Sequence, residues 1–187
     1  MAAENRSASE RELPPFDPGL DHFARLGQAR TMDLDGDALE RAYLERSREV
    51  HPDRFAAADA GTRRLAMEHS AALNAAYAAL SKRISRAEYL VKLGGVDLDS
   101  SDPNTGAPHP DQAFLIDMIE RREQLAELAG DEDGLDELRE QVEDEGKRVL
   151  AAAEAALAEQ DTRAAAAHLV HHRYLRRFLA EIDAQLD

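Results

Sequence analysis

The sequence predicts an all-α protein made of two helical units. Alanine is very frequent among the 187 residues, whereas β-branched and aromatic residues are few, and this composition favours helix over sheet. Apolar residues recur at helical spacing through most of the chain. Residues 96–110, rich in proline, aspartate and serine, interrupt these patterns and predict a linker. We therefore expect a helical hairpin within residues 20–95 and an antiparallel three-helix bundle over residues 111–187.

The net charge of −15 is distributed unevenly along the chain. Residues 20–95 hold 12 Lys and Arg against 11 Asp and Glu, a net charge of +1. Residues 96–187 hold 9 against 23, a net charge of −14. Such asymmetry indicates two units with separate partners. The acidic half would be repelled by phosphates, so we expect no nucleic-acid binding.

Other classes of protein are excluded by composition. The chain has no cysteine, so disulfides and thiolate metal sites are absent. No apolar run approaches the roughly 18 residues that a membrane span needs. The N-terminus lacks the apolar core of a signal peptide. We expect a cytoplasmic, monomeric protein that binds no membrane, metal or cofactor.

The first part of the chain combines a tail and a short helix. Residues 1–19 are polar, contain three prolines and show no periodicity, which predicts a disordered tail. Residues 21–27 predict a short helix closed by Gly27. Phe23 and Leu26 share one face of it and should dock on the hairpin.

The predicted hairpin turns at a proline. Helical patterns over residues 38–50 and 63–81 flank Pro52, which lacks an N–H and biases His51 away from the α region. The first helix should therefore end near this point. His51 and Asp53 would then lie exposed at the tip of a rigid two-helix arm, where they could contact a partner.

The first hairpin helix also carries arginines opposite its apolar face. Arg41 and Arg48 most simply form a solvated face, and the functional alternative is a basic docking surface beside the turn. Glu40, Glu45 and Glu49 dilute the positive charge, so the electrostatic signal alone is weak.

Three helical patterns follow the linker, over residues 111–129, 134–160 and 162–186. Their short connections imply antiparallel neighbours and hence a three-helix bundle. The expected core line of the second helix is Leu135, Leu138, Val142, Val149, Ala153 and Leu157. The expected core line of the third is His168, Leu175, Leu179, Ile182 and Leu186.

The first bundle helix carries two apolar faces. Its core stripe is Phe114, Met118, Leu125 and Leu128. The second face comprises Leu115, Ile116 and Ile119, with acidic neighbours Glu120, Glu123 and Glu127. A helix in such a bundle is buried on one side only, so the second face should lie near water. Scattered surface apolars are normal, and the linker or the front unit could cover these. The alternative is a protein-binding patch with an acidic rim.

The motifs in the first half resemble a known module. His51-Pro52-Asp53 follows Tyr43 and Val50 at helical spacing and precedes Phe55, and residues 74–77 read Asn-Ala-Ala-Tyr. This combination resembles the J-domain, by which co-chaperones switch on a DnaK-type ATPase.

Segments of both halves make the resemblance more specific. Residues 71–77, 86–90, 95–98 and 113–125 resemble HscB, the J-type co-chaperone of iron–sulfur cluster assembly. The similarity runs from about residue 20 to the C-terminus. It implies an L-shaped pair, a J-domain over residues 20–95 and a scaffold-binding bundle over residues 111–187, in a non-catalytic adaptor.

The resemblance also implies two partners and the residues that bind them. The loop that stimulates the DnaK-type chaperone HscA would use His51, Pro52, Asp53, Arg41, Arg48 and Arg54. The surface that holds the scaffold protein IscU would use Leu115, Ile116, Ile119, Glu120, Glu123, Glu127 and Tyr174.

Two departures from the family pattern are visible. The proline usual before residues 86–90 is missing, so we expect a less sharply kinked connection there. Eukaryotic relatives carry a cysteine-rich front, so this cysteine-free chain resembles the bacterial form.

Two alternatives remain open. The first is a J-protein that delivers another client. The second is a metal enzyme, because His168 and His172 form an i, i+4 pair near His171. The simpler interpretation is that His168 lines the bundle while the other two are solvated. No Glu lies between these histidines to serve as a base, and a third ligand is missing.

Overall fold

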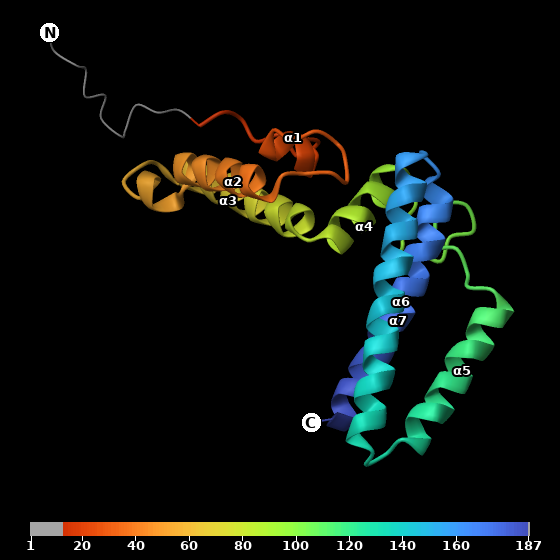
Figure 1. The fold of residues 1–187 in the computed structure, drawn as a ribbon. Helices are drawn as coiled ribbons and strands as arrows, with labels where there is room; N and C mark the ends of the chain where they lie inside the picture. The colour runs from red at the N-terminus through yellow and green to blue at the C-terminus, as the bar shows by residue number, and fades with distance from the viewer. Residues whose placement is uncertain (1–12, 187) are drawn as a thin grey trace, which may run out of the picture. The chain divides into compact units, whose positions relative to one another are not determined.

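The computed structural model describes residues 13–186, which fold into helices joined by loops (Figure 1). This confirms the all-α class predicted from the sequence. The helices are α1 His22–Leu26, α2 Gly36–Val50, the 3₁₀ helix η2 Pro52–Phe55, α3 Ala60–Ser81, α4 Arg83–Leu93, α5 Gln112–Glu127, α6 Glu132–Ala158 and α7 Thr162–Leu186. Within residues 13–186, no helix combines the length and apolar character that a membrane crossing requires.

The chain divides between Arg86 and Ala87 into two compact units. We call them the front unit and the back unit. The division falls inside α4, so the last turns of this helix belong to the back unit.

The front unit is built on the pair of α2 and α3, which lie side by side (Figure 1). The carboxylate of Asp35 accepts hydrogen bonds from the first backbone N–H groups of α2 and so caps the helix. The ring of Tyr43 stacks on Tyr77 with centroids 4.4 Å apart. Its hydroxyl donates to Oδ1 of Asn74 at 2.8 Å, so this asparagine links α3 to α2. Buried residues of this core include Phe23, Leu26, Leu39, Leu73, Ala76 and Leu80.

The short helix α1 packs on this pair as the sequence predicts. Phe23 and Leu26 are fully buried, and α1 contacts both α2 and α3. Gly27 ends the helix in the left-handed region, with φ of 66°. A side chain there would also collide with the guanidinium of Arg46, which donates to the carbonyl of Arg25. Glycine therefore suits both the conformation and the space.

The prediction of a disordered tail over residues 1–19 is wrong for residues 14–17, which contact the front unit. Residues 1–12 lie outside the described range. The carbonyl oxygen of Pro14 lies 2.9 Å from Nε2 of His69 on α3. The ring of Phe16 packs edge-to-face with the ring of His69. The guanidinium of Arg25 stacks over the face of the Phe16 ring in a cation–π contact. Arg25 also donates to the carbonyl of Asp17. These contacts come from residues distant in sequence, so local composition could not reveal them.

The connection between α3 and α4 breaks without a proline. Lys82 alone leaves the helical conformation, with φ of −101° and ψ of 134°. Arg86, almost fully buried, donates to the carbonyls of Leu80 and Met32, at 2.8 and 2.6 Å. The guanidinium thus satisfies the carbonyl of Leu80, which the end of α3 leaves without a helical partner, and ties α4 to the loop that precedes α2.

The back unit is built on α6 and α7, which lie against each other along their length (Figure 1). The carboxylate of Asp161 accepts from the N–H of Ala164 and caps α7. Residues from three helices form the core: Met118, Leu125, Leu135, Leu138, Val142, Leu175, Phe178 and Ile182. The predicted three-helix arrangement therefore shares one core.

The predicted core line of α7 is partly wrong. Leu175 and Ile182 are buried as expected, but Leu169 and Phe178 are fully buried as well, while His168 is only half-buried. The buried arc of α7 is wider than one stripe, because α6 covers the helix from one side and α5 adds core side chains from another.

Helix α5 is held to the other two helices mainly by long side chains. Met118 and Leu125 reach the core. Arg122 donates from Nε and from its terminal nitrogen to the carboxylate of Glu181 on α7, at 2.9 and 3.0 Å. Backbone contacts of α5 with its neighbours are sparse compared with those between α6 and α7. Space therefore remains between α5 and α6.

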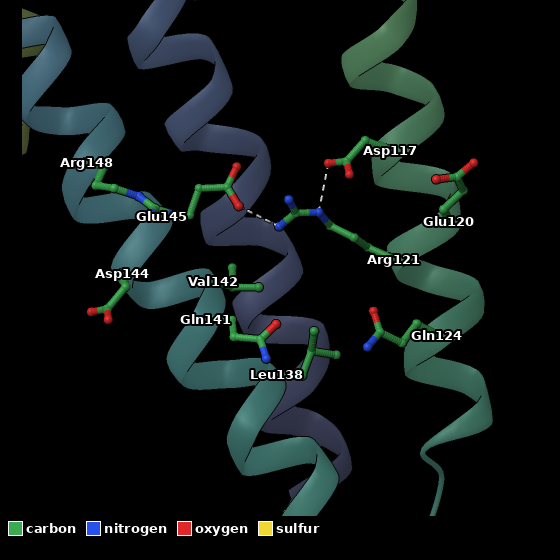
Figure 2. Close-up of a pocket in the computed structure, with 10 residues that line it drawn as sticks. All are labelled: Asp117, Glu120, Arg121, Gln124, Leu138, Gln141, Val142, Asp144, Glu145 and Arg148. Atoms are coloured by element: carbon green, nitrogen blue, oxygen red, sulfur yellow. Dashed lines mark hydrogen bonds and ion pairs between the residues drawn. The ribbon is translucent and has the colours of Figure 1, made fainter.

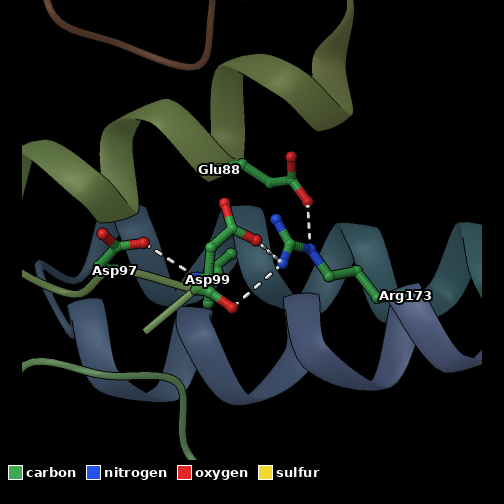
Figure 3. A network of polar contacts seen from close by, with 5 residues as sticks. Glu88, Asp97, Asp99 and Arg173 are labelled. Carbon is green, nitrogen blue, oxygen red and sulfur yellow. Dashed lines mark hydrogen bonds and ion pairs between the residues drawn. The ribbon is translucent and has the colours of Figure 1, made fainter. Parts of the chain in front are cut away.

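The predicted linker is a loop fastened to the helices of the back unit (Figure 3). Nε of Arg173 on α7 donates to Glu88 on α4 at 2.8 Å. Its terminal nitrogen donates to the carbonyl of Leu98 at 3.1 Å and the carboxylate of Asp99 at 2.7 Å. Burial opposes the charge of Arg173, yet its hydrogen bonds to Glu88 and Asp99 raise the pKa of the guanidinium. One side chain thus fixes α4 and the loop to α7.

A half-buried histidine should make the stability of the back unit depend on pH. The side chain of His172, on α7, lines a small pocket together with residues of α6. Its Nδ1 is buried and has no hydrogen-bond partner among the described residues. Burial first, and the charge of Arg176 second, lower the pKa of His172 below its ordinary 6.5, against the opposing charge of Glu88. The folded state therefore favours neutral His172. Its contribution to stability is full above pH 6.5 and is lost as the pH falls below that value.

We expect the free energy of unfolding to decrease as the pH is lowered from about 7.5 to about 5.5. The decrease should be smaller for His172→Gln. Urea denaturation followed by circular dichroism measures the difference. His109→Gln, at an exposed loop histidine, serves as the matched control and should follow the unmodified chain. Identical pH curves for His172→Gln and the unmodified chain would contradict this role for His172.

Candidate functional site

The turn between α2 and α3 forms where Pro52 stops the helix. His51 adopts φ of −58° and ψ of 127°, an extended conformation that a following proline favours. Pro52 then starts η2, a position where its missing N–H costs nothing. Phe55 at the end of η2 is buried and anchors the turn on the front core. The backbone of the His-Pro-Asp turn, residues 51–53, is thereby fixed at both ends.

The polar side chains of this turn face water. The side chain of His51 is 55% exposed and that of Asp53 is 91% exposed. Nδ1 of His51 accepts from the N–H of Asp53 at 3.3 Å and lies 3.7 Å from its carboxylate. Arg54 donates to the carbonyl of Arg48 at 2.8 Å and so ties the turn to the end of α2. The two side chains are oriented by the turn and remain free to meet a partner.

The outer face of α2 lies beside this turn. Arg41 and Arg48 are exposed, as predicted, and so is Glu45. Leu44 is 42% exposed between the two arginines, and the sequence prediction missed it. Its spacing of three and four residues from them was the available signal, because such residues share a helical face. Leu44 is therefore an exposed apolar side chain flanked by the positive charges of Arg41 and Arg48.

The second apolar face of α5 lies in water, as its helical angle predicts. Leu115 is 39% exposed, Ile116 is 47% exposed and Ile119 is 56% exposed. Three exposed acids, Glu120, Glu123 and Glu127, lie on the same side of the helix. We call these six residues the α5 outer face. Isolated surface apolars are common, but three large ones on one turn form a patch suited to protein contact.

Aromatic rings connect α5 to α7 beside this face. Tyr174 is half-buried and meets the ring of Phe114 edge-on at 5.6 Å. His171 stacks on Phe114 with ring centroids 4.0 Å apart, so the expectation of a solvated His171 is wrong. Burial first, and His168 second, lower the pKa of His171, which keeps the stacked ring neutral. Among the described residues, no group of three or more His, Cys, Asp or Glu side chains is arranged to hold a metal ion.

A groove of about 520 Å³ opens between α5 and α6 (Figure 2). Arg121 crosses it, with Nε 2.7 Å from the carboxylate of Asp117 and a terminal nitrogen 2.7 Å from that of Glu145 on α6. Burial opposes the charge of Arg121, but Glu145 and Asp117 outweigh it and raise the pKa of the guanidinium. The sequence shows the i, i+4 pair of Asp117 and Arg121 but not their partner on α6. We call this space the α5–α6 groove.

The predicted site residues thus fall into two separate groups. The His-Pro-Asp turn and the arginines of α2 belong to the front unit, and the α5 outer face and Tyr174 belong to the back unit. Known proteins are similar to this chain over most of its length. The chain is 37% identical over 169 residues to the "Co-chaperone protein HscB homolog" of Paraburkholderia phymatum, covering 89% of this chain and 94% of that relative. The chain belongs to the HscB co-chaperone family.

Other comparisons agree with membership of the HscB family. The homologue from Neisseria meningitidis is 33% identical over 156 residues, which span 82% of this chain and 92% of that protein. The family model described as the HSCB C-terminal oligomerisation domain matches residues 110–183, which contain α5, α6 and most of α7.

Solved structures of HscB proteins have the same fold. Human HscB superposes with a TM-score of 0.81 at 28% identity, covering 98% of this chain and 91% of that one. HscB from Vibrio cholerae gives a TM-score of 0.74 at 27% identity, covering 88% and 96%. The front unit is accordingly a J-domain, and the back unit contains the C-terminal helical bundle of the HscB family.

Proposed function

We propose that this protein is an adaptor of iron–sulfur cluster assembly in the cytoplasm. Its back unit binds the scaffold protein IscU through the α5 outer face. Its J-domain docks the His-Pro-Asp turn on the DnaK-type chaperone HscA and stimulates ATP hydrolysis there. In this proposal the chain supplies contacts and orientation, and the chemistry of hydrolysis belongs to the chaperone.

The exposed turn is the observation that carries the proposal. His51 and Asp53 project into water from a backbone fixed by Pro52 and Phe55. A partner therefore meets preorganised groups, and little conformational entropy is lost on docking. Arg41, Leu44 and Arg48 extend the contact along α2 with charge and apolar surface.

The α5 outer face supports the client half of the proposal. Its apolar centre would release water on contact, and its acidic rim would select a partner with basic residues. A chain that holds the scaffold with one unit and the chaperone with the other raises the local concentration of client at the chaperone. Stimulation requires that the turn bind the hydrolysing state of HscA better than its alternative state.

The steady-state ATPase rate of purified HscA tests the function. We expect the rate to rise when this protein is added, and to rise further when IscU is added with it. A pull-down with purified IscU distinguishes this client from another. An unchanged rate in the presence of both proteins would contradict the proposal.

A further inference from the structure

The α5–α6 groove has an apolar floor and polar walls. Leu138 and Val142 of α6, both buried, form its floor. Gln124 and Gln141 reach into the gap from the two opposite helices (Figure 2). A groove of this kind suits a side chain with an aliphatic stem and a polar head.

The charge lining the groove is negative in excess. Six charged side chains line it: Asp117, Glu120, Arg121, Asp144, Glu145 and Arg148. Arg121 is already paired with Asp117 and Glu145, and Lys147 pairs with Asp144 at 2.7 Å. Glu120 has no hydrogen bond or ion pair from its side chain among the described residues. Arg148 on α6 is likewise without a hydrogen bond or ion pair from its side chain among the described residues. Four carboxylates against two guanidinium groups still leave the lining with a net charge of −2, and Glu120 is the unpaired acid on the α5 wall.

Lysine and arginine fit both properties of the groove. Their methylene stems pack on apolar surface while the charged head stays in a polar setting. The stem would lie along the groove above Leu138, which keeps a small exposed surface, and the head would reach Glu120. The net charge of the residues from 96 onward, −14, favours a basic occupant over an acidic one.

The groove is continuous with the α5 outer face, because Glu120 belongs to both. We infer that the partner docked on the α5 outer face inserts a lysine or arginine side chain into the α5–α6 groove. This inference rests on the proposed function and extends the scaffold contact from α5 onto α6. Affinity and salt dependence then depend on Gln141, a residue outside the α5 outer face.

Substitution of Gln141 tests the inference through the α6 wall alone. Because a lysine there would repel the incoming cation, Gln141→Lys should lower the affinity for IscU about tenfold and flatten its dependence on ionic strength. Gln141→Glu should raise the affinity. Isothermal titration calorimetry with purified IscU measures both.

Ala155→Lys is the matched control. It adds the same charge at an exposed position of α6 outside the groove, and it should change the affinity by less than about twofold. If both lysine variants lowered the affinity for IscU equally, the loss would be a general effect of added positive charge. That result would overturn the inference, while IscU binding itself would stand. No binding of IscU by the unmodified chain would remove the proposed function and the inference together.

A second copy of this chain is the competing occupant. Sedimentation velocity without IscU distinguishes a groove that holds a side chain of the scaffold from one that holds a second copy of this chain. We expect equal sedimentation of the unmodified chain and Gln141→Lys. A dimer that Gln141→Lys dissociates would assign the groove to self-association and overturn the inference.

Discussion

Replacement of Asp53 by asparagine is expected to return the ATPase rate of HscA to its basal value, even with IscU present. The change keeps the shape of the side chain and removes its charge. A cation on the chaperone that pairs with this carboxylate would be left unpaired, a loss of about 2–5 kcal/mol for a desolvated pair. Because Asp53 is almost fully exposed, the fold should be unaffected. Steady-state phosphate release measures the rate.

Asp33→Asn is the control for this experiment, since it removes an exposed carboxylate from the same unit outside the turn. It should stimulate like the unmodified chain. His51→Gln should behave like Asp53→Asn, because the imidazole is the other exposed group of the turn. Full stimulation by Asp53→Asn, with circular dichroism unchanged, would sink the proposed role of the His-Pro-Asp turn.

The double substitution Leu115→Ala with Ile119→Ala is expected to weaken IscU binding by about 2 kcal/mol, or about thirtyfold, as the loss of two central apolar contacts implies. Both side chains face water, so no core contact is lost, and alanine keeps the helical propensity high. Calorimetry reports the affinity, and far-ultraviolet circular dichroism reports the helix content.

Met67→Ala is the counterpart in the front unit. Met67 is 61% exposed on α3, so its truncation removes exposed apolar surface without touching the α5 outer face. The affinity of the Met67→Ala variant for IscU should equal that of the unmodified chain. A double variant that binds IscU with undiminished affinity would show that the client contacts another surface.

The sequence predicted well what depends on local chemistry. The ends of the short helix at Gly27 and of the first hairpin helix before Pro52 follow from backbone restrictions, which act within a few residues. The exposure of Leu115, Ile116 and Ile119 follows from the helical period once one face is assigned to the core. Both features are properties of a single helix and its ends.

What the sequence missed depends on residues far apart in the chain. Pro14 and His69 are 55 positions apart, so their contact leaves no periodic signal. The ion pair between Arg121 and Glu145 crosses the α5–α6 groove and joins two helices. The wide buried arc of α7 likewise reflects two neighbours covering one helix. Each of these features is decided by tertiary packing and not by local preference.

The contacts of Arg173 determine where the chain can be cut. A fragment that begins at the start of α5 would contain this arginine but lose Glu88, Leu98 and Asp99, its three acceptors. A guanidinium deprived of its partners in a partly buried place destabilises whatever remains. A fragment that keeps these contacts of the back unit therefore has to begin upstream of Glu88, so that it includes the last turns of α4.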